Sequence, residues 1–211
     1  MKGNVKFAVA ISLLLACLCL TLASCGGSKS QKVIASDMST EALEECVELC
    51  EYKNIELSTE GKAKQDVLIA HIMKNSSIVK YPEGAVEYYV EQLEEQYEYY
   101  ADQIGMKYED MLKELGENDA TIIDDARELV KQDLVLELIR RRENITLTDA
   151  DKSDFFDKYV EKYADNYGYS EEYVRENLSE SVYSSMIYDK TMEFLIINNQ
   201  FIEETPEQTE Q

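Results

Sequence analysis

The amino-acid sequence predicts an all-α fold in which long helices surround one central helix. Residues 119–142 carry the clearest signal, because their apolar side chains recur at the spacing of a helix face. The chain of 211 residues contains only 2 Pro and 8 Gly, so few positions would interrupt a helix. No alternating pattern of strand length is present. We therefore expect one helical domain over residues 37–202.

Helix ends can be placed from capping residues and from apolar spacing. Pro82 suits the first turn of a long helix, and Gly105 lies just beyond the end of that helix. Thr148 and Asp151 form a candidate capping box at the start of another helix. A brief extended segment, residues 51–57, separates the first two helices. The expected helices are residues 39–50, 60–74, 82–104, 107–115, 119–142, 149–167, 171–177 and 179–201.

The helix expected over residues 82–104 has a narrow apolar seam with intervals of 4, 3, 4, 3 and 4 residues. Its members are Val86, Val90, Leu93, Tyr97, Tyr100 and Ile104. Such a seam, accompanied by additional Tyr, predicts a helical arm that packs against one partner and leaves much of its surface exposed.

The central helix has a broader apolar surface. Its row of apolar side chains consists of Ile123, Ala126, Val130, Leu134 and Leu138. Near Val135 and Ile139 the apolar surface widens, which predicts contact from several sides. Asn118 and Asp119 are candidate N-caps for this helix. We expect it to be the core helix that the other elements pack around.

The net charge of the chain limits its partners. The sequence has 43 Asp and Glu against 21 Lys and Arg, a formal net charge of −22. Such a surface repels phosphate backbones, so we expect no nucleic-acid partner. The same charge favours solubility and attracts cationic polypeptide segments. Tyr is abundant, with 15 residues, whereas Trp is absent.

The start of the chain has the pattern of an export signal. Lys2 and Lys6 precede an apolar stretch, residues 7–22, that is short for a membrane span. Residues 22–25, Leu-Ala-Ser-Cys, resemble a bacterial lipobox, in which a peptidase cleaves before a Cys whose thiol takes a lipid. An ordinary secretory signal with a chance cysteine is the alternative.

The lipobox resemblance sets the expected localisation and the outer domain boundaries. It implies a signal peptide at residues 1–24, then a lipidated Cys25 and a flexible tether at residues 25–36. The protein is then extracytoplasmic and held by lipid on a bacterial membrane, on the outer face of the cell membrane or on the periplasmic face. Residues 203–211 are polar and acidic, and we expect them to form a disordered tail.

The sequence offers no catalytic or metal-binding pattern. Cys46 and Cys50 share one face of the helix expected over residues 39–50, where we expect half-buried thiols because a disulfide would strain the helix. A metal site would need further ligands, and His71, the only histidine, is expected at the edge of the core. No phosphate-binding loop and no Ser/His/Asp arrangement occurs. We predict no catalytic residue, no metal and no cofactor.

Three stretches together resemble a known family. Residues 64–105 place Asn75 and Pro82 between one helix and the first arm. Residues 126–148 lead a long helix into the next arm, and residues 186–197 form a closing helix. In order and separation these stretches resemble the C-terminal, peptide-binding region of trigger factor, an architecture that recurs in the chaperone SurA.

The resemblance implies a chaperone, or holdase, that binds unfolded or partly folded secreted polypeptides between two helical arms. Tyr supplies apolar area with a polar tip, which suits contact with varied sequences. Some of the Tyr side chains are also expected to pack between helices. The residues expected to bind clients are Tyr88, Tyr89, Tyr99, Tyr108, Met111, Phe156 and Tyr163.

The chain also departs from trigger factor. Residues 52–57 resemble the segment that leads into the family's peptidyl-prolyl isomerase domain, yet the next helix begins a few residues later, whereas a domain needs about 50 residues. We therefore expect no isomerase activity. The leader and the tether replace the ribosome-docking domain. Two alternatives stay open, namely a scaffold lipoprotein for one dedicated envelope protein, and an isomerase or other enzyme.

Overall fold

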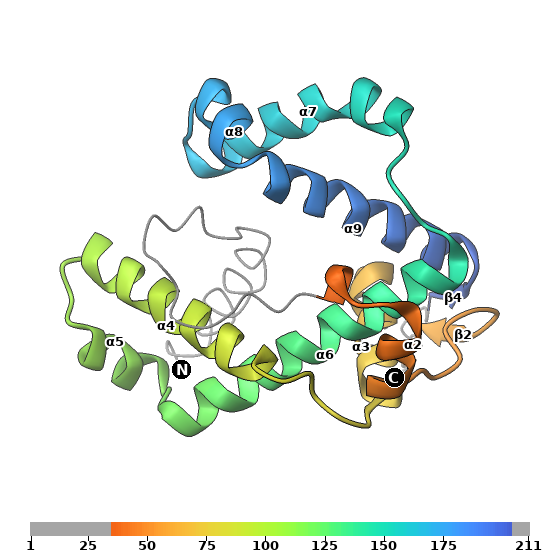
Figure 1. Cartoon of the computed structure of the whole chain (residues 1–211), viewed down its shortest axis with the longest axis horizontal. Helices are drawn as coiled ribbons and strands as arrows, with labels where there is room; N and C mark the ends of the chain where they lie inside the picture. The colour runs from red at the N-terminus through yellow and green to blue at the C-terminus, as the bar shows by residue number, and fades with distance from the viewer. Residues whose placement is uncertain (1–34, 204–211) are drawn as a thin grey trace, which may run out of the picture. The chain divides into compact units, whose positions relative to one another are not determined.

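The computed structural model describes residues 35–203 and confirms the predicted all-α class (Figure 1). In chain order the elements are η1 Ala35–Asp37, α2 Thr40–Cys46, β1 Val47–Glu48, β2 Glu56–Ser58, α3 Lys64–Asn75, β3 Ser77–Ile78, α4 Ala85–Gln103, α5 Tyr108–Leu115, α6 Asp119–Glu143, α7 Asp149–Tyr167, α8 Glu171–Asn177, α9 Ser179–Ile197 and β4 Gln200–Ile202. The predicted signal peptide, Cys25 and nearly all of the tail lie outside the described residues. Within residues 35–203, no helix combines the length and the apolar character that a bilayer crossing requires.

The described chain divides into two compact units. One unit, which we call the body, consists of residues 35–81, 131–145 and 189–203. The other unit contains the first arm, residues 82–130, and the second arm, residues 146–188. Because the unit boundaries fall inside α6 and α9, each of these helices contributes one part to the body and one part to an arm.

The body is built around the second part of α6, where the apolar surface widens as predicted. All six residues from 134 to 139 are buried, five of them apolar and the sixth Glu137. Glu137 accepts hydrogen bonds from Arg140 at 3.1 Å and from Arg141 at 2.7 Å, which satisfies its charge in the interior. Arg140 Nε also donates to Oγ1 of the buried Thr191, 3.1 Å away, and so joins α6 to α9.

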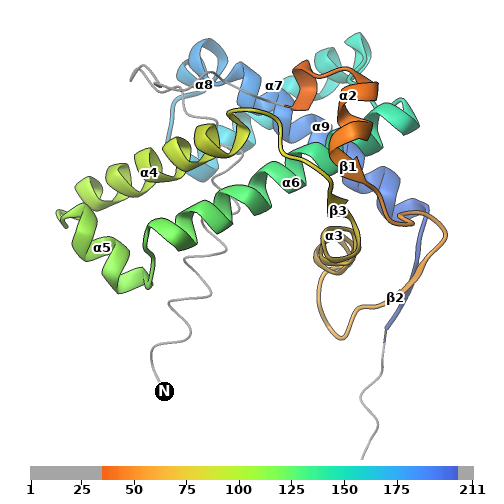
Figure 2. The same ribbon diagram turned by 60° about the horizontal axis from the view of Figure 1, so that its bottom comes forward.

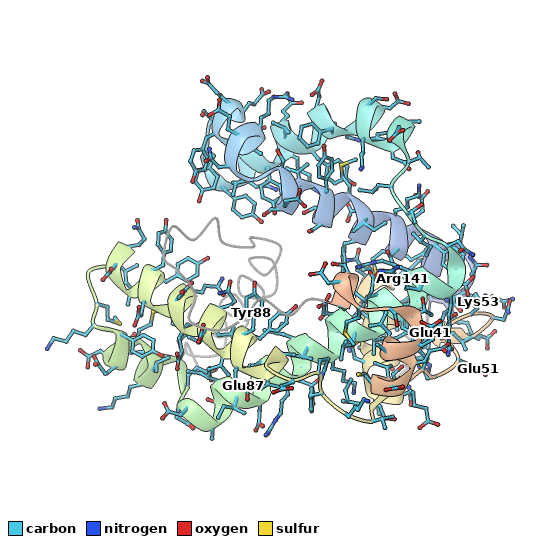
Figure 3. The ribbon with its side chains drawn as sticks, viewed as in Figure 1. Glu41, Glu51, Lys53, Glu87, Tyr88 and Arg141 are labelled. Carbon is cyan, nitrogen blue, oxygen red and sulfur yellow. The ribbon has the colours of Figure 1, made fainter. Side chains whose placement is uncertain are left out.

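The first described residues are held on the same part of α6. The backbone N–H of Ala35 donates to Asp133 Oδ2 at 3.0 Å. Arg141, labelled in Figure 3, donates to the carbonyl oxygen of Ser36 at 2.8 Å. Ala35 is buried as a result. The last two residues of the predicted tether are therefore part of the body.

The strands correct the expectation that no strand occurs. Val47 in β1 lies opposite Ile78 in the antiparallel β3, and Glu56 in β2 lies opposite Gln200 in the parallel β4. Each strand has only two or three residues, which is too short for an alternating pattern to appear. The paired residues are 31 and 144 positions apart in the sequence, so only the tertiary structure brings them together.

The first strand ends the first helix early. α2 stops at Cys46, four residues before the predicted end, because β1 follows directly. Cys46 and Cys50 therefore do not share a helix face, contrary to the prediction. Cys46 is buried, and this burial raises the pKa of its thiol. Cys50 is half-buried, and both cysteines are free thiols.

Three other helix ends differ from the prediction. α4 begins at Ala85 after Gly84, whose φ of 75° is a left-handed conformation that suits glycine. Pro82 therefore precedes the helix instead of standing in its first turn. α3 begins at Lys64 because residues 59–62 form a tight turn. α9 ends before its predicted end, since residues 200–202 form β4.

Several predicted caps are confirmed. Thr148 Oγ1 accepts from the backbone N–H of Asp151 at 3.1 Å, and Asp151 Oδ2 accepts from the backbone N–H of Thr148 at 2.8 Å. This reciprocal pair is a capping box, with Asp in place of the usual Glu. Asn118 Oδ1 accepts from the backbone N–H of Ala120 at 3.0 Å at the start of α6. The start of these helices was therefore readable from local sequence.

Candidate functional site

The first arm is a helical hairpin that packs against the start of α6 (Figure 2). The core residues are Leu93 and Tyr97 from α4, Leu112 from α5, and Ile122 and Ala126 from α6. The predicted seam is confirmed on the α4 side, since Val86 and Val90 also pack against this core. On α6, Ile122 faces inward, whereas the predicted Ile123 is 37% exposed.

The seam does not continue to the end of α4. Ile104, its last predicted member, is 63% exposed, and Tyr99 is 54% exposed. The rings of Tyr99 and Tyr100 meet edge to face with their centroids 5.8 Å apart. Gly105, with a φ of 67°, then turns the chain towards α5. This end of the first arm therefore presents apolar area at its surface.

The acidic excess of the protein is concentrated in the first arm. Residues 82–130 contain 15 Asp and Glu against 3 Lys and Arg, a difference of −12. The second arm contains 10 against 4, and the body contains 15 against 10 over a longer stretch of chain. The first arm is therefore the most negative part of the described chain, although its Tyr content gives it apolar area as well.

Burial, together with this concentration of carboxylates, raises three pKa values in the first arm. Burial, followed by the negative charges of Glu117 and Asp125, raises the pKa of Tyr97. Burial and several carboxylates likewise raise the pKa of Tyr108. The pKa of Asp125 is raised by partial burial and then by Glu117. The phenols of Tyr97 and Tyr108 therefore stay neutral at all physiological pH values.

The second arm consists of α7, α8 and the first part of α9. The core residues are Val160, Tyr163, Ala164, Val174, Leu178, Val182 and Met186. Four aromatic side chains pack at the edge of this core and remain partly exposed, namely Phe156, Tyr159, Tyr167 and Tyr183. Along α7, Val160 and Tyr163 lie in this core and Phe156 at its edge, whereas Phe155 is 49% exposed. The neighbouring Phe156 thus points to the core side while Phe155 points to solvent.

Cations of the second arm cover some of its own aromatic rings. The rings of Phe156 and Tyr183 lie with centroids 5.1 Å apart and planes inclined by 34°. The guanidinium carbon of Arg175 lies 5.9 Å from the centroid of the Phe156 ring. Lys152 Nζ lies 5.3 Å from the centroid of the Tyr183 ring. Each ring is therefore contacted both by the other ring and by a cation.

A second exposed aromatic pair joins the turn after α7 to the first turn of α8. Tyr169 is 39% exposed and Tyr173 is 41% exposed, and their ring centroids are 5.1 Å apart. Sequence reasoning did not select Tyr169, Tyr173, Phe155 or Ile104 as binding residues. Ile104 follows the end of α4, Tyr169 follows the end of α7, and Tyr173 lies in the first turn of α8. Fewer neighbouring residues can cover a side chain near a helix end. That position is a signal that could have identified them.

The seven residues predicted to bind clients differ in how far the structure exposes them. Tyr99 is the one that is strongly exposed. Tyr88, labelled in Figure 3, is 9% exposed and Tyr163 is 4% exposed, so these two side chains lie in the interior and do not supply open binding surface. The other four are half-buried against the arm cores, namely Tyr89, Tyr108, Met111 and Phe156.

The two arms offer surfaces for non-covalent contact. In the described part of the chain, no group of three or more His, Cys, Asp or Glu side chains is placed to hold a metal ion. His71 lies on α3 in the body, half-buried, with Nδ1 3.3 Å from the side-chain amide of Asn75. This agrees with its expected place at the edge of the core. Exposed aromatic and aliphatic side chains on an acidic framework are the feature that can bind another molecule.

Comparison with known proteins identifies the family to which the helical domain belongs. None of the curated proteins and none of the solved structures is significantly similar to the chain. The family model of the bacterial trigger factor protein C-terminus, however, matches residues 44–197, well over half of the 211 residues. Domains of that family are of the chaperone type, which bind polypeptides and are not catalytic. The chain therefore belongs to the family of bacterial trigger factor C-termini.

Proposed function

We propose that this protein is a membrane-anchored extracytoplasmic chaperone that holds unfolded or partly folded secreted polypeptides. The observation that carries the proposal is the exposure of apolar side chains on both arms of a domain from a polypeptide-binding family. Each apolar contact removes surface from water and contributes about 25 cal/mol per Å². Several contacts of this kind hold many different sequences without requiring a particular one.

The exposed side chains suit clients of varied sequence. Tyr99, Tyr169 and Tyr173 each combine an apolar ring with a hydroxyl that can donate or accept a hydrogen bond. Ile104 and Phe155 add purely apolar area. An extended polypeptide presents both apolar side chains and backbone polar groups, so this mixture matches an unfolded chain better than a folded surface.

The charge of the first arm adds an electrostatic preference. Its 15 acidic side chains against 3 basic ones attract unfolded segments that carry Lys or Arg. Charges on an exposed surface are screened by salt over about 8 Å at physiological ionic strength. We therefore expect cationic clients to associate faster at low salt than at high salt, and stopped-flow fluorescence with a labelled unfolded client measures this difference.

The proposed chaperone has no isomerase activity. β2 ends at Ser58 and α3 begins at Lys64, and the tight turn at residues 59–62 occupies most of the connection. A separate domain needs about 50 residues or more, so none is inserted at this point of the chain. An assay of prolyl-peptide isomerisation should show no acceleration over the uncatalysed rate, and clear catalysis would contradict this part of the proposal.

The proposed anchor is a lipid on Cys25. Its support is the lipobox pattern of residues 22–25, preceded by the positively charged and apolar segments of an export signal. Two or more acyl chains hold a protein on a bilayer far more firmly than one. The Cys25→Ala variant should move from the membrane fraction to the soluble fraction of cells. Unchanged fractionation would rule out lipidation at this residue.

Suppression of aggregation tests the chaperone proposal directly. The full chain with Cys25→Ala is mixed in molar excess with a chemically denatured secreted protein, and light scattering follows aggregation after dilution of the denaturant. We expect the scattering to fall in proportion to the added chaperone. An unchanged aggregation rate at molar excess would refute the proposal.

A matched pair of variants locates the holding surface. Ile104→Ser removes an apolar side chain, 63% exposed, from the first arm, and Ile197→Ser removes one, 74% exposed, from the body. If the arms hold the client, only Ile104→Ser weakens suppression. Equal weakening by both variants would show that any exposed apolar side chain suffices. A crosslinked pull-down that yields one stoichiometric partner would instead favour a dedicated scaffold.

A further inference from the structure

We propose that the Phe156–Tyr183 ring pair of the second arm is a docking site for client segments in which an aromatic or aliphatic side chain lies beside a carboxylate. In the free protein, the side chains of Arg175 and Lys152 lie over the two rings. The proposal rests on the proposed function, because it names the client chemistry that one arm accepts. It gives the second arm a preference that differs from the attraction of the first arm for cationic segments. The two arms together would then serve clients with both kinds of charge.

The two rings of the pair are fixed in place by packing against the core of the second arm. Phe156 comes from α7 and Tyr183 from α9, and both side chains pack against the core that contains Val160 and Val182. Their centroids are 5.1 Å apart, so the two rings also support each other. Both rings remain partly exposed at the edge of the core. A third apolar side chain could therefore extend an aromatic cluster that already exists.

The Arg175 guanidinium over the Phe156 ring is held only by exposed ion pairs. Arg175, whose guanidinium lies over Phe156, forms ion pairs with Asp157 at 2.7 Å and with Glu171 at 3.3 Å. The side chains of Asp157 and Glu171 are 79% and 56% exposed, and that of Arg175 is 38% exposed. Exposed ion pairs contribute little stability and are screened by salt. The guanidinium can therefore leave the ring at small cost.

The charges around the pair select the occupant. Lys152 over Tyr183 and Arg175 over Phe156 place two cations at the point where a client side chain must enter. These cations repel a client Lys or Arg and attract a client carboxylate. A client Asp or Glu can replace Asp157 or Glu171 on Arg175, so the guanidinium stays paired while it leaves the ring. Asp151, next to Lys152 in the chain, keeps its negative charge and is held in the cap of α7, where it accepts from the backbone N–H of Thr148.

Two labelled peptides of identical apolar content test the proposal. One carries Glu beside Phe and Leu, and the other carries Lys at the same positions. Binding to the full chain is measured by fluorescence anisotropy for the wild type and for the double variant Lys152→Gln/Arg175→Gln. We expect the double variant to bind the Glu peptide about tenfold more weakly, which is the scale of two lost cation contacts, and to bind the Lys peptide more tightly than the wild type does, because the two repelling cations are gone.

The matched control removes two cations from the same arm but away from the ring pair. Lys158→Gln/Lys162→Gln changes the net charge equally and should alter the affinity for the Glu peptide by less than about twofold. The cations over Phe156 and Tyr183 are kept, and Lys162 lies over the Tyr159 ring instead, 5.5 Å from its centroid. Equal losses in both double variants would overturn the proposal, and so would a failure of the wild type to bind the Glu peptide while it still suppresses aggregation. A loss of aggregation suppression itself would instead count against the proposed function.

Discussion

The body joins segments that are far apart in the sequence, whereas each arm joins neighbouring helices. In the body, Ala35 bonds to Asp133 across 98 residues, and Asn199 Nδ2 donates to the carbonyl oxygen of Tyr52 across 147 residues. In the second arm, the ion pair between Arg175 and Asp157 spans only 18 residues. The first arm is likewise built from α4, α5 and the start of α6, which follow one another along the chain.

Because of this difference, the body can provide the stability of the protein while the arms provide its binding surface. Closing long loops costs conformational entropy, so the body forms only when many distant segments assemble together. The arms need only local contacts and can form, or open, in smaller steps. An arm can therefore keep apolar side chains at its surface without weakening the body.

Leu134→Asp should unfold the body. Leu134 is 2% exposed in the second part of α6, so the variant buries a carboxylate among apolar side chains. The expected loss is about 4 kcal/mol or more, a large share of the stability of a domain. Thermal unfolding followed by circular dichroism measures it. A variant that melts within a few degrees of the wild type would show that this part of α6 is not the structural centre of the body.

The control for that variant lies on the same helix. Ile123→Asp introduces the same carboxylate at a position that is 37% exposed in the first arm. Surface substitutions usually change stability by less than about 0.5 kcal/mol, so this variant should melt close to the wild type. A comparable loss in both variants would mean that α6 tolerates no charge anywhere, which would contradict the distinction between body and arm.

Val174→Ala should loosen the second arm alone. Val174 is fully buried in the core of that arm, and the truncation leaves a small cavity that costs about 2 kcal/mol. Amide hydrogen exchange should become faster in residues 146–188 and remain unchanged in residues 131–145. Faster exchange throughout the described chain would show that arm and body unfold as one unit.

Glu143→Gln should weaken the body by about 1 kcal/mol at neutral pH, because it disrupts a partly exposed ion pair. Glu143 accepts from Lys53 at 2.6 Å and from the hydroxyl of Tyr52 at 2.8 Å. The hydrogen bond from Lys53, followed by that from Tyr52, lowers the pKa of Glu143 below its ordinary value of 4.5. Because the pKa of Glu143 is lower in the folded protein than in the unfolded chain, its ionised carboxylate stabilises the folded state at pH values above the unfolded-state pKa. This contribution is lost as the pH falls through the pKa of Glu143 in the folded protein.

The pH dependence distinguishes this interaction from others. The stability difference between wild type and Glu143→Gln should shrink as the pH falls below the ordinary glutamate pKa of 4.5, which chemical denaturation between pH 3 and pH 7 measures. At high pH the same cluster opposes ionisation of Tyr52, whose pKa is raised to about 12 by burial and then by Glu143. The body should therefore lose stability above pH 10. Glu45→Gln, in an exposed pair with Lys80, is the control and should leave the pH profile nearly unchanged.

Tyr99→Ala should have the smallest effect on stability and still reduce client holding. The side chain is 54% exposed, so its removal should change the unfolding free energy by less than about 0.5 kcal/mol. Suppression of aggregation should fall because apolar contact area is lost from the first arm. Tyr89, which packs against the arm core, is a less suitable probe because its truncation also affects packing. Unchanged suppression by Tyr99→Ala would remove Tyr99 from the binding surface.

Local sequence determined most of the helical framework. Apolar periodicity placed α4 and α6, and side-chain caps at Thr148 and Asn118 placed the start of α7 and of α6. The widening of the apolar surface after Leu134 correctly indicated a helix contacted from several sides. These features are readable because a helix repeats every 3.6 residues and its caps act over three or four positions.

Tertiary structure alone decided the strands and the exposure of individual side chains. β1 and β4 pair with segments 31 and 144 residues away, and these pairings end α2 and α9 earlier than local periodicity suggests. The buried Tyr88 and the exposed Tyr99 belong to the same helix, and sequence reasoning assigned both to the binding surface. A periodic pattern shows which residues share a helix face. Which face is covered depends on where the neighbouring helices lie, and that is a property of the folded chain.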